Sequence, residues 1–406
     1  MTELILFDDA IARDWAPFAL TRPIGELLFG AFTQRARSER ALAARCVGHA
    51  GCPELSGFDE PGAAPVLDEI PPAHHARIFL CSRVVLTWGN RPQWPAQPAA
   101  VLVAGRVAGW FVPAGAAAPE PRALSGLAAA PPPPGTLDLP GRWLRNVWDL
   151  ITGNTAQLGT DLAELAGKDP PEPPLGLACL GYRPGMLQLG EDVTIEPGVV
   201  FDFTDGPIRL DDRVVVRAFT RLSGPAYVGP DSVLLGGPYS HISVGPVCKV
   251  HGELEASVVL GYSNKAHDGF LGHAYLGRWV NLGAMTTNSD LKNNYGSVRL
   301  WTPGGSVDTG EMKIGCLLGD HVKTGIGALL NTGTVVGAGA NLYGAELPPK
   351  YVAPFSWGSG AQLSSYDVEK FLATAELAMG RRQVQLTDAM KRLLRAAWQR
   401  GRGEVA

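Results

Sequence analysis

Residues 276–287 decide the fold, and they read LGRWVNLGAMTT. They form two six-residue units, each of which begins with Leu-Gly and has a small or aliphatic residue at its fifth position. Related hexads are spread between about residue 187 and residue 344: LGEDVT (189–194), IEPGVV (195–200), VGPDSV (228–233), VGPVCK (244–249), VHGELE (250–255), LGDHVK (318–323) and VGAGAN (336–341). A repeat of this kind has to be recognised first, because it determines the whole architecture.

A six-residue period provides one short strand and one turn, with the leading aliphatic residue directed inward. Three hexads close a triangular coil, and stacked coils bury one continuous column of Leu, Ile and Val. Glycine at the second position suits a place where a side chain would crowd the backbone. The pattern predicts a left-handed parallel β-helix over residues 176–358. A Gly-rich β-sandwich is the alternative, and the number of hexads in phase disfavours it.

The rest of the chain differs from the hexad region in composition and in the spacing of its apolar residues. Residues 1–112 mix strand candidates, such as 4–7, with helical stretches, which is typical of an α/β domain. Residues 113–175 combine a Pro/Ala-rich linker, with four prolines at 131–134, and a helix expected over 142–165. A C-terminal helix is expected within residues 359–406, with its apolar face packed on the β-helix.

Composition excludes several classes of function. The formal net charge is −4 and the pI is about 6.1, so no basic field favours nucleic acid. The most apolar stretch, residues 98–119, is interrupted by Arg106, glycines and prolines, which argues against membrane insertion. The N-terminus lacks the basic residues of an export signal, and the six cysteines form no C-x-x-C pair. We therefore expect a cytoplasmic protein with reduced thiols.

Function is expected where the period is interrupted, because inserted residues must leave the coil as a loop. The first interruption, GYSNKAHDGFLGH at 261–273, contains a base candidate, His267, with Asp268 next to it as a residue that could orient the imidazole. Lys265 could hold a phosphate or carboxylate. The second interruption, residues 288–313, is rich in amides, and Asn288 is a candidate for hydrogen bonding to a polar ligand.

Five strings in order carry a family resemblance: GYSNKAHDGFLGHAYLGRWVNLGA (261–284), NSDLKNNYGSVRLW (288–301), GDHVKTGI (319–326), NTGTVVGAGANLYG (331–344) and FSWG (355–358). They resemble the acetyltransferase domain of bifunctional N-acetylglucosamine-1-phosphate uridylyltransferase/glucosamine-1-phosphate acetyltransferases, in a divergent branch of sugar nucleotidyltransferases. A weaker resemblance reaches the N-terminus through FDD (7–9) and ALTRPIGEL (19–27).

The resemblance implies a homotrimer that uses acetyl-CoA as co-substrate and small molecules as partners. It implies that His267 is the base that deprotonates an amino sugar phosphate. Asn281 matches a substrate-binding asparagine, Lys265 lies in a matching S-x-K-A stretch, and Phe270 stands where the family has a tyrosine. The family's phosphate-binding basic residues have no clear counterparts, so the identity of the substrate stays open.

The N-terminal domain resembles a reduced nucleotidyltransferase domain. Arg13 and Arg22 resemble the end of a nucleotide-binding loop, but the loop glycines are absent. Asp8 and Asp9 are candidates for holding Mg²⁺. Arg22 and Glu26 are either a structural pair or remnants of a ligand site.

The leading hypothesis is acetyl-CoA-dependent N-acetylation of an amino sugar phosphate in sugar-nucleotide biosynthesis. The alternatives are a sugar-1-phosphate nucleotidyltransferase that uses the β-helix as a trimerisation scaffold, and a sugar-nucleotide-binding protein without catalysis. A zinc enzyme on the same coil is a further alternative, although His267 and His273 lack the expected spacing.

Overall fold

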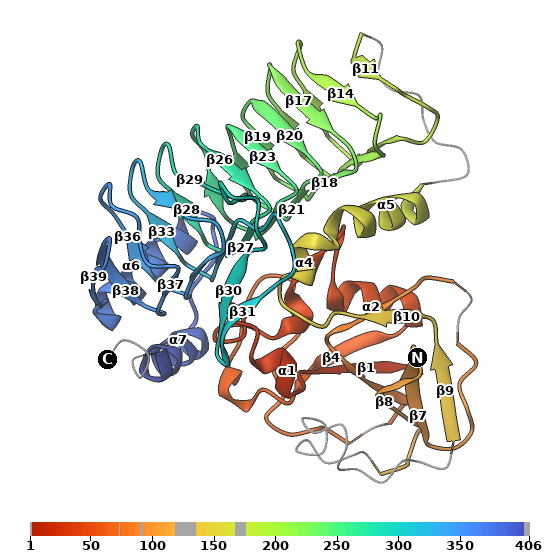
Figure 1. The fold of residues 1–406 in the computed structure, drawn as a ribbon. Helices are drawn as coiled ribbons and strands as arrows, with labels where there is room; N and C mark the ends of the chain where they lie inside the picture. The colour runs from red at the N-terminus through yellow and green to blue at the C-terminus, as the bar shows by residue number, and fades with distance from the viewer. Residues whose placement is uncertain (1, 73, 90–91, 118–134, 167–175, 402–406) are drawn as a thin grey trace. The chain divides into compact units, whose positions relative to one another are not determined.

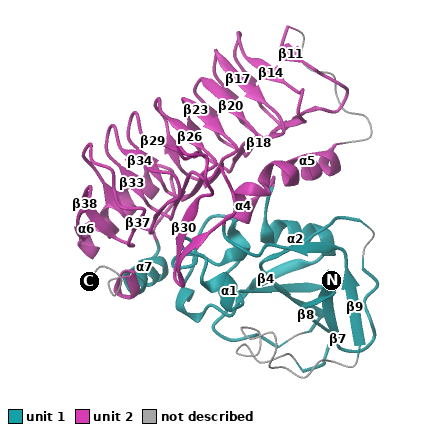
Figure 2. Ribbon diagram, in the orientation of Figure 1, with its two compact units in different colours: residues 1–27, 32–147, 387–397 teal, residues 28–31, 148–386, 398–406 magenta. Residues whose placement is uncertain are grey.

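A computed structural model describes residues 2–72, 74–89, 92–117, 135–166 and 176–401. The described chain forms two compact units (Figure 2). The first comprises residues 1–27, 32–147 and 387–397, and the second comprises residues 28–31, 148–386 and 398–406. The predicted fold class, an α/β unit followed by a left-handed parallel β-helix, is confirmed.

A six-stranded mixed sheet forms the centre of the first unit. Its order is β4 (Arg45–Ala50), β1 (Glu3–Phe7), β5 (Arg77–Cys81), β8 (Arg106–Val112), β7 (Ala99–Val103) and β9 (Gly135–Leu139). Strand β1 pairs in parallel with both β4 and β5, and its apolar run is buried, as expected for a central strand. A second pair consists of β6 (Val84–Leu86) and β10 (Gly141–Trp143).

Short helices and strands complete this part of the chain: α1 (Ala10–Arg13), η1 (Ile24–Glu26), β2 (Leu28–Phe29), β3 (Phe32–Thr33), α2 (Gln34–Leu42) and η2 (Pro53–Leu55). Because β9 pairs in parallel with β7, the first unit extends beyond the expected boundary at residue 112. The four prolines of the expected linker lie outside the described residues. The helix expected over 142–165 is shorter, because β10 occupies its start and α4 (Asp149–Thr152) and α5 (Asn154–Leu165) follow.

Three parallel sheets form the faces of the β-helix, and Figure 1 shows their strands stacked along the second unit. Face 1 contains β11 (Ala178–Leu180), β14 (Val200–Asp202), β17 (Thr220–Ser223), β20 (Gly237–Ser240), β23 (Glu253–Glu255) and β26 (Phe270–Gly272), followed by the pair β29 (Thr287–Asn288) and β34 (Leu329–Leu330). Face 2 contains β12 (Leu187–Leu189), β15 (Ile208–Leu210), β18 (Ala226–Val228), β21 (Ser243–Val244), β24 (Val258–Gly261), β27 (Tyr275–Arg278), β32 (Cys316–Leu318), β35 (Thr334–Val336) and β37 (Tyr351–Val352). Face 3 contains β13 (Thr194–Ile195), β16 (Val215–Val216), β19 (Val233–Leu234), β22 (Lys249–Val250), β25 (Asn264–Lys265), β28 (Asn281–Leu282), β33 (Lys323–Thr324), β36 (Asn341–Leu342) and β38 (Ser356–Ser359), which ends in a hairpin with β39 (Gln362–Ser365).

A column of buried aliphatic side chains explains the hexad pattern. On face 2 the registered positions are Leu210, Val228, Val244, Val259, Leu276, Leu318, Val336 and Val352. Gly245, at the second position of its hexad, lies where a side chain would crowd the backbone, as expected. A Cβ added to Gly245 would lie 2.2 Å from the carbonyl oxygen of Leu260 in the next coil, so only glycine fits there.

The C-terminal region contains two helices where one was expected. Helix α6 spans Val368–Gly380 and α7 spans Asp388–Gly401, and the chain turns between them, with Gln383 at a left-handed φ of 58°. The expectation that this region packs on the β-helix holds for α6, because Phe371 lies 5.7 Å from His321 and 5.0 Å from Phe355 between ring centroids. None of the helices in the described ranges is long and apolar enough to cross a membrane.

The column of inward side chains predicts which leucine substitutions lower the free energy of unfolding. Leu276→Ala should lower the free energy of unfolding by about 2–5 kcal/mol, because it leaves a cavity in a fully buried position. Leu329→Ala is the matched control, since that side chain is 45% exposed, and we expect a change within about 0.5 kcal/mol. Urea denaturation of both variants checks this, and equal losses would contradict the column.

Candidate functional site

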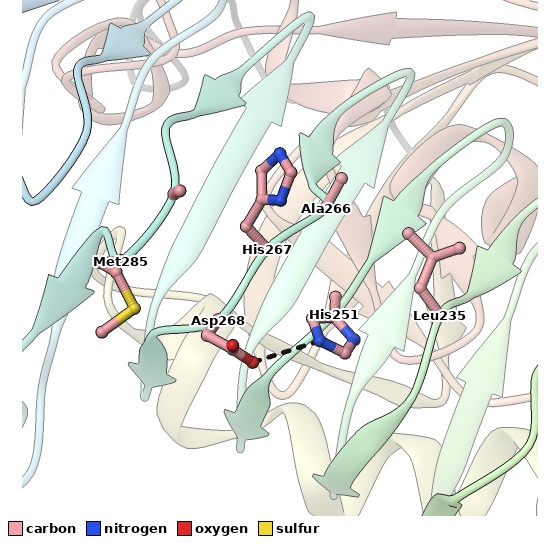
Figure 3. A pocket seen from close by; sticks show the side chains of 7 residues that line it. Leu235, His251, Ala266, His267, Asp268 and Met285 are labelled. Carbon is pink, nitrogen blue, oxygen red and sulfur yellow. Dashed lines mark ion pairs between the residues drawn. The ribbon is translucent and has the colours of Figure 1, made fainter.

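A recess in one corner of the β-helix forms the candidate site. Val250 pairs with Lys265 and Glu253 pairs with Phe270, so two residues turn the corner from face 3 to face 1 in one coil and four, residues 266–269, turn it in the next. The shorter corner leaves the flank of the longer one uncovered. An open pocket lies at this corner, and it is lined by Leu235, His251, Ala266, His267, Asp268, Ala284 and Met285 (Figure 3).

Two imidazoles from adjacent coils enter this pocket. His267 is exposed, and in the described chain nothing hydrogen-bonds to its ring. Asp268 does not orient His267, as the sequence suggested. Its Oδ1 instead lies 3.1 Å from Nε2 of His251, and Figure 3 shows the ring of His267 directed away from this pair. Asp268 lies in the bend between β25 and β26, where its carboxylate reaches the histidine of the adjacent coil.

Lys265 lies beneath the pocket and does not line it. The side chain is only 3% exposed, and Nζ donates to the carbonyl oxygens of His251 and His267, each at 2.8 Å. Burial lowers the pKa of Lys265 to about 8, although the nearby charge of Asp268 opposes this shift. The expected contact of Lys265 with a phosphate or carboxylate is therefore replaced by contacts with the main chain.

The other residues predicted to bind substrate do not line the pocket. Asn281 lies on the outer side of β28, where its Oδ1 accepts from Nδ2 of Asn264 at 3.2 Å. The backbone amide of Phe270 donates to Thr287 Oγ1 at 3.3 Å. Asn288 is buried, and its side-chain amide bonds to both the N–H and the C=O of Gly272. Asn288 thus fastens the second interruption to the coil below it.

The second interruption forms a hairpin of β30 (Arg299–Thr302) and β31 (Gly305–Asp308), and both of its ends are tied down. At the start, Asp290 Oδ2 lies 2.8 Å from His273 Nδ1, and at the end Lys313 Nζ lies 3.2 Å from Glu255. Burial would raise the pKa of Asp290, but the hydrogen bond and charge of His273 and the charge of Lys313 lower it overall. These contacts hold the loop in place.

In the first unit, the carboxyl ends of β1 and β5 bring Asp8 and Asp9 near Ser82 and Arg83. Asp8 accepts from Ser82 Oγ at 2.5 Å and from the Ile24 amide at 3.1 Å, and burial raises its pKa. Asp9 caps α1 through the Ala12 amide and forms a two-pronged ion pair with Arg83 at 2.8 and 2.5 Å.

This arrangement does not suit Mg²⁺, because both carboxylates are buried and engaged by protein donors. Groups of three or more His, Cys, Asp or Glu side chains that could hold a metal ion are absent from the part of the chain that the structure describes. The candidate zinc site built from histidines is therefore not assembled within that part of one chain.

The arginines expected near a nucleotide also have protein partners. Arg22 is buried and bonds to both oxygens of Glu60 at 3.0 Å, and it does not pair with Glu26. Glu26 bonds to Arg35 at 2.6 Å and to His49 at 2.8 Å. Burial opposes ionisation of Glu26, but His49 and Arg35 lower its pKa to about 2. Arg13 pairs with Glu54 at 3.1 Å near the surface.

The hexad coils form a left-handed parallel β-helix with an open pocket at one corner, and comparison with known proteins adds the following matches. Residues 4–57 match the family described as sugar nucleotidyl transferase. The chain is 27% identical over 148 residues to the bifunctional sugar-1-phosphate nucleotidylyltransferase/acetyltransferase of Sulfurisphaera tokodaii, a match that covers 34% of this chain and 36% of that protein. The bifunctional protein GlmU of Nitrosospira multiformis is 32% identical over 136 residues, covering 28% of this chain and 29% of that protein.

The resemblance that the motifs indicated, to bifunctional nucleotidyltransferase/acetyltransferases, is thus confirmed. The matched stretches span about a third of the length of these curated relatives. Among solved structures, the UDP-N-acetylglucosamine acyltransferase of Campylobacter jejuni covers 51% of this chain and 82% of its own, with 17% identity and a TM-score of 0.21. A score this low carries no argument of its own.

Lys265 predicts a pH dependence of stability. Below about pH 8 the ammonium is charged in both the folded and unfolded chain, so its burial cost is present in full. Between about 8 and 10.5 only the unfolded chain holds this proton, so stability rises with pH. Urea denaturation at pH 7 and pH 10 should show that the wild type gains stability relative to Lys265→Met. A difference that stays constant, or falls, would contradict this prediction.

Proposed function

We propose that the protein is an acetyl-CoA-dependent N-acetyltransferase that acts on an amino sugar phosphate, with His267 as the general base. The observation that carries the proposal is the corner pocket, which is lined by the His251–Asp268 pair of adjacent coils and by the exposed imidazole of His267. The similar protein of Sulfurisphaera tokodaii is named a bifunctional sugar-1-phosphate nucleotidylyltransferase/acetyltransferase, which supports acetyl transfer as the reaction. That the acceptor is an amino sugar phosphate is part of this proposal as well.

The proposed reaction needs a base for the acceptor amine. His267 takes one proton from the ammonium group, and the nitrogen lone pair attacks the carbonyl carbon of the thioester. The C–N bond forms, the C–S bond breaks, and the second proton of the nitrogen goes to the departing thiolate of coenzyme A. The exposed ring of His267 suits this role, because a base must reach both the substrate and water to be reset.

We also propose a homotrimer, in which a neighbouring copy closes the open pocket. Large apolar side chains project along the same corner: Phe219 is 86% exposed, Met285 55% and Ile326 79%. Such exposure is unusual for a free surface and is typical of an interface. The cytoplasmic location expected from the sequence stays a prediction.

If His267 is the general base, its substitution should cause a specific loss of activity. His267→Ala should lower kcat for acetyl transfer to glucosamine 1-phosphate by about 10²-fold or more, the usual contribution of a general base. His241→Ala is the matched control, since His241 lies at another corner and pairs with the exposed Asp205 at 3.5 Å. Release of the coenzyme A thiol measures both variants. A full rate in His267→Ala would overturn the proposed mechanism, whereas a wild type without acetyl transfer would favour a binding protein.

Nucleotidyl transfer by the first unit is the second candidate, favoured by the match of residues 4–57 to sugar nucleotidyl transferases. In that case the β-helix would serve as a trimerisation scaffold. The buried pairs Asp9–Arg83 and Arg22–Glu60 argue against it, because they occupy the side chains that would contact phosphates and metal.

A pyrophosphate-release assay separates the two candidates. With Mg²⁺, UTP or dTTP and several sugar 1-phosphates, we expect no release above background, because the strand-end carboxylates are already engaged. Release with any pair of substrates that is lost in Asp9→Asn would restore the nucleotidyltransferase candidate.

A further inference from the structure

Lys265 occupies an inward position of face 3 that aliphatic side chains hold in the coils on either side of it. The inward column of face 3 runs through Ile195, Val216, Leu234 and Val250, and Val250 pairs directly with Lys265. Leu282 holds the next position, since Asn264 pairs with Asn281. An aliphatic residue would fill this place at no electrostatic cost, so a lysine there needs another reason.

The ammonium connects the two histidine-bearing corners. It donates to the carbonyl oxygen of His251 in one coil and to that of His267 in the next, both at 2.8 Å. Gly252 leaves the space for it, because a Cβ added there would lie 2.9 Å from Nζ. The lysine therefore holds the main chain on both sides of the recess.

This contact also sets the direction of one peptide group. The peptide between His267 and Asp268 is trans, so its N–H points opposite to its C=O. Since that carbonyl points inward to the buried ammonium, the N–H of Asp268 points outward from the coil. The ammonium group of Lys265 polarises the carbonyl that accepts from it, and this makes the N–H of the same peptide a stronger donor. A backbone N–H of this kind can stabilise the oxyanion that forms in acyl transfer.

We infer that Lys265 is a positioning residue of the acyl-transfer site, which fixes the peptide between His267 and Asp268 and turns its N–H toward the acyl group. The inference rests on the proposed acetyltransferase function. It assigns Lys265 no contact with substrate, in contrast to the phosphate-binding role that the sequence suggested. It also accounts for a charged side chain within an aliphatic column.

The test compares Lys265→Met with Lys323→Met in the full-length protein. Methionine has a similar length and restores an apolar column, and Lys323 is a matched control because burial also lowers its pKa to about 8 while its Nζ lies 3.5 Å from a single carbonyl, that of His321. Four quantities are measured for each variant: Tm, kcat, KM for acetyl-CoA with glucosamine 1-phosphate as acceptor, and hydrogen–deuterium exchange of the peptide covering residues 283–286, in which the N–H of Met285 donates to the carbonyl oxygen of Asp268 at 2.9 Å.

We expect Lys265→Met to keep Tm within about 5 °C of the wild type and KM within about twofold, while kcat falls at least tenfold. Exchange at Met285 should become at least tenfold faster, because the main chain that carries its acceptor, Asp268, is no longer held by the ammonium group. Lys323→Met should leave kcat and this exchange unchanged.

An unchanged kcat or unchanged exchange in Lys265→Met would overturn the inference. A fall in kcat that accompanies a large fall in Tm would also overturn it, because the role would then be structural only. If the wild type transfers no acetyl group, the proposed function fails, and the exchange measurement alone tests Lys265. Unchanged exchange in Lys265→Met would then show that Lys265 does not position the main chain. Faster exchange would show that Lys265 holds the main chain without a role in acyl transfer.

Discussion

The register of the coils depends on one constraint, the stacking of inward side chains between main-chain ladders. Each coil offers only a few inward positions, and a slip by one residue would turn a whole strand's apolar side chains toward solvent. On face 2 the column from Leu210 to Val352 has no polar member, so this face fixes the phase of the repeat. Once the phase is fixed, only the corners are free to vary.

Because the corners can vary, they are the places where the second unit can carry functional side chains. Corners differ in length and in the side chains that they carry, and each corner has a distinct character. At the corner between faces 2 and 3, the rings of Tyr262 and Trp279 pack at 4.5 Å between centroids, tilted by 36°, and Phe371 of α6 packs against His321. The corner between faces 1 and 2 holds the tied loop with His273 and Asp290. The corner between faces 3 and 1 is recessed and holds the pocket, so acid–base groups are exposed there on a rigid support.

The repeat made the β-helix predictable from the sequence, because a six-residue period with inward aliphatic residues has few other solutions. His267 was identified because it interrupts the period, whereas His251 was overlooked as a partner although it directly follows Val250, the registered neighbour of Lys265. Chemical type alone does not reveal the protein contacts of Lys265, Asn288 and Asp9. Each looked suited to a ligand, and each is used up by backbone or ion-pair contacts that only the three-dimensional structure reveals. The two C-terminal helices were predicted as one, because their apolar spacing continues across the turn at residues 381–387.

We propose that acyl transfer takes place at the recessed corner between faces 3 and 1. Hydrogen–deuterium exchange of the full-length protein with and without acetyl-CoA tests this most directly. We expect slower exchange on binding at residues 266–269 and 283–286, which carry His267, Asp268 and Met285. Slower exchange confined to the loop at residues 288–313, or to the strand ends of the first unit, would contradict it.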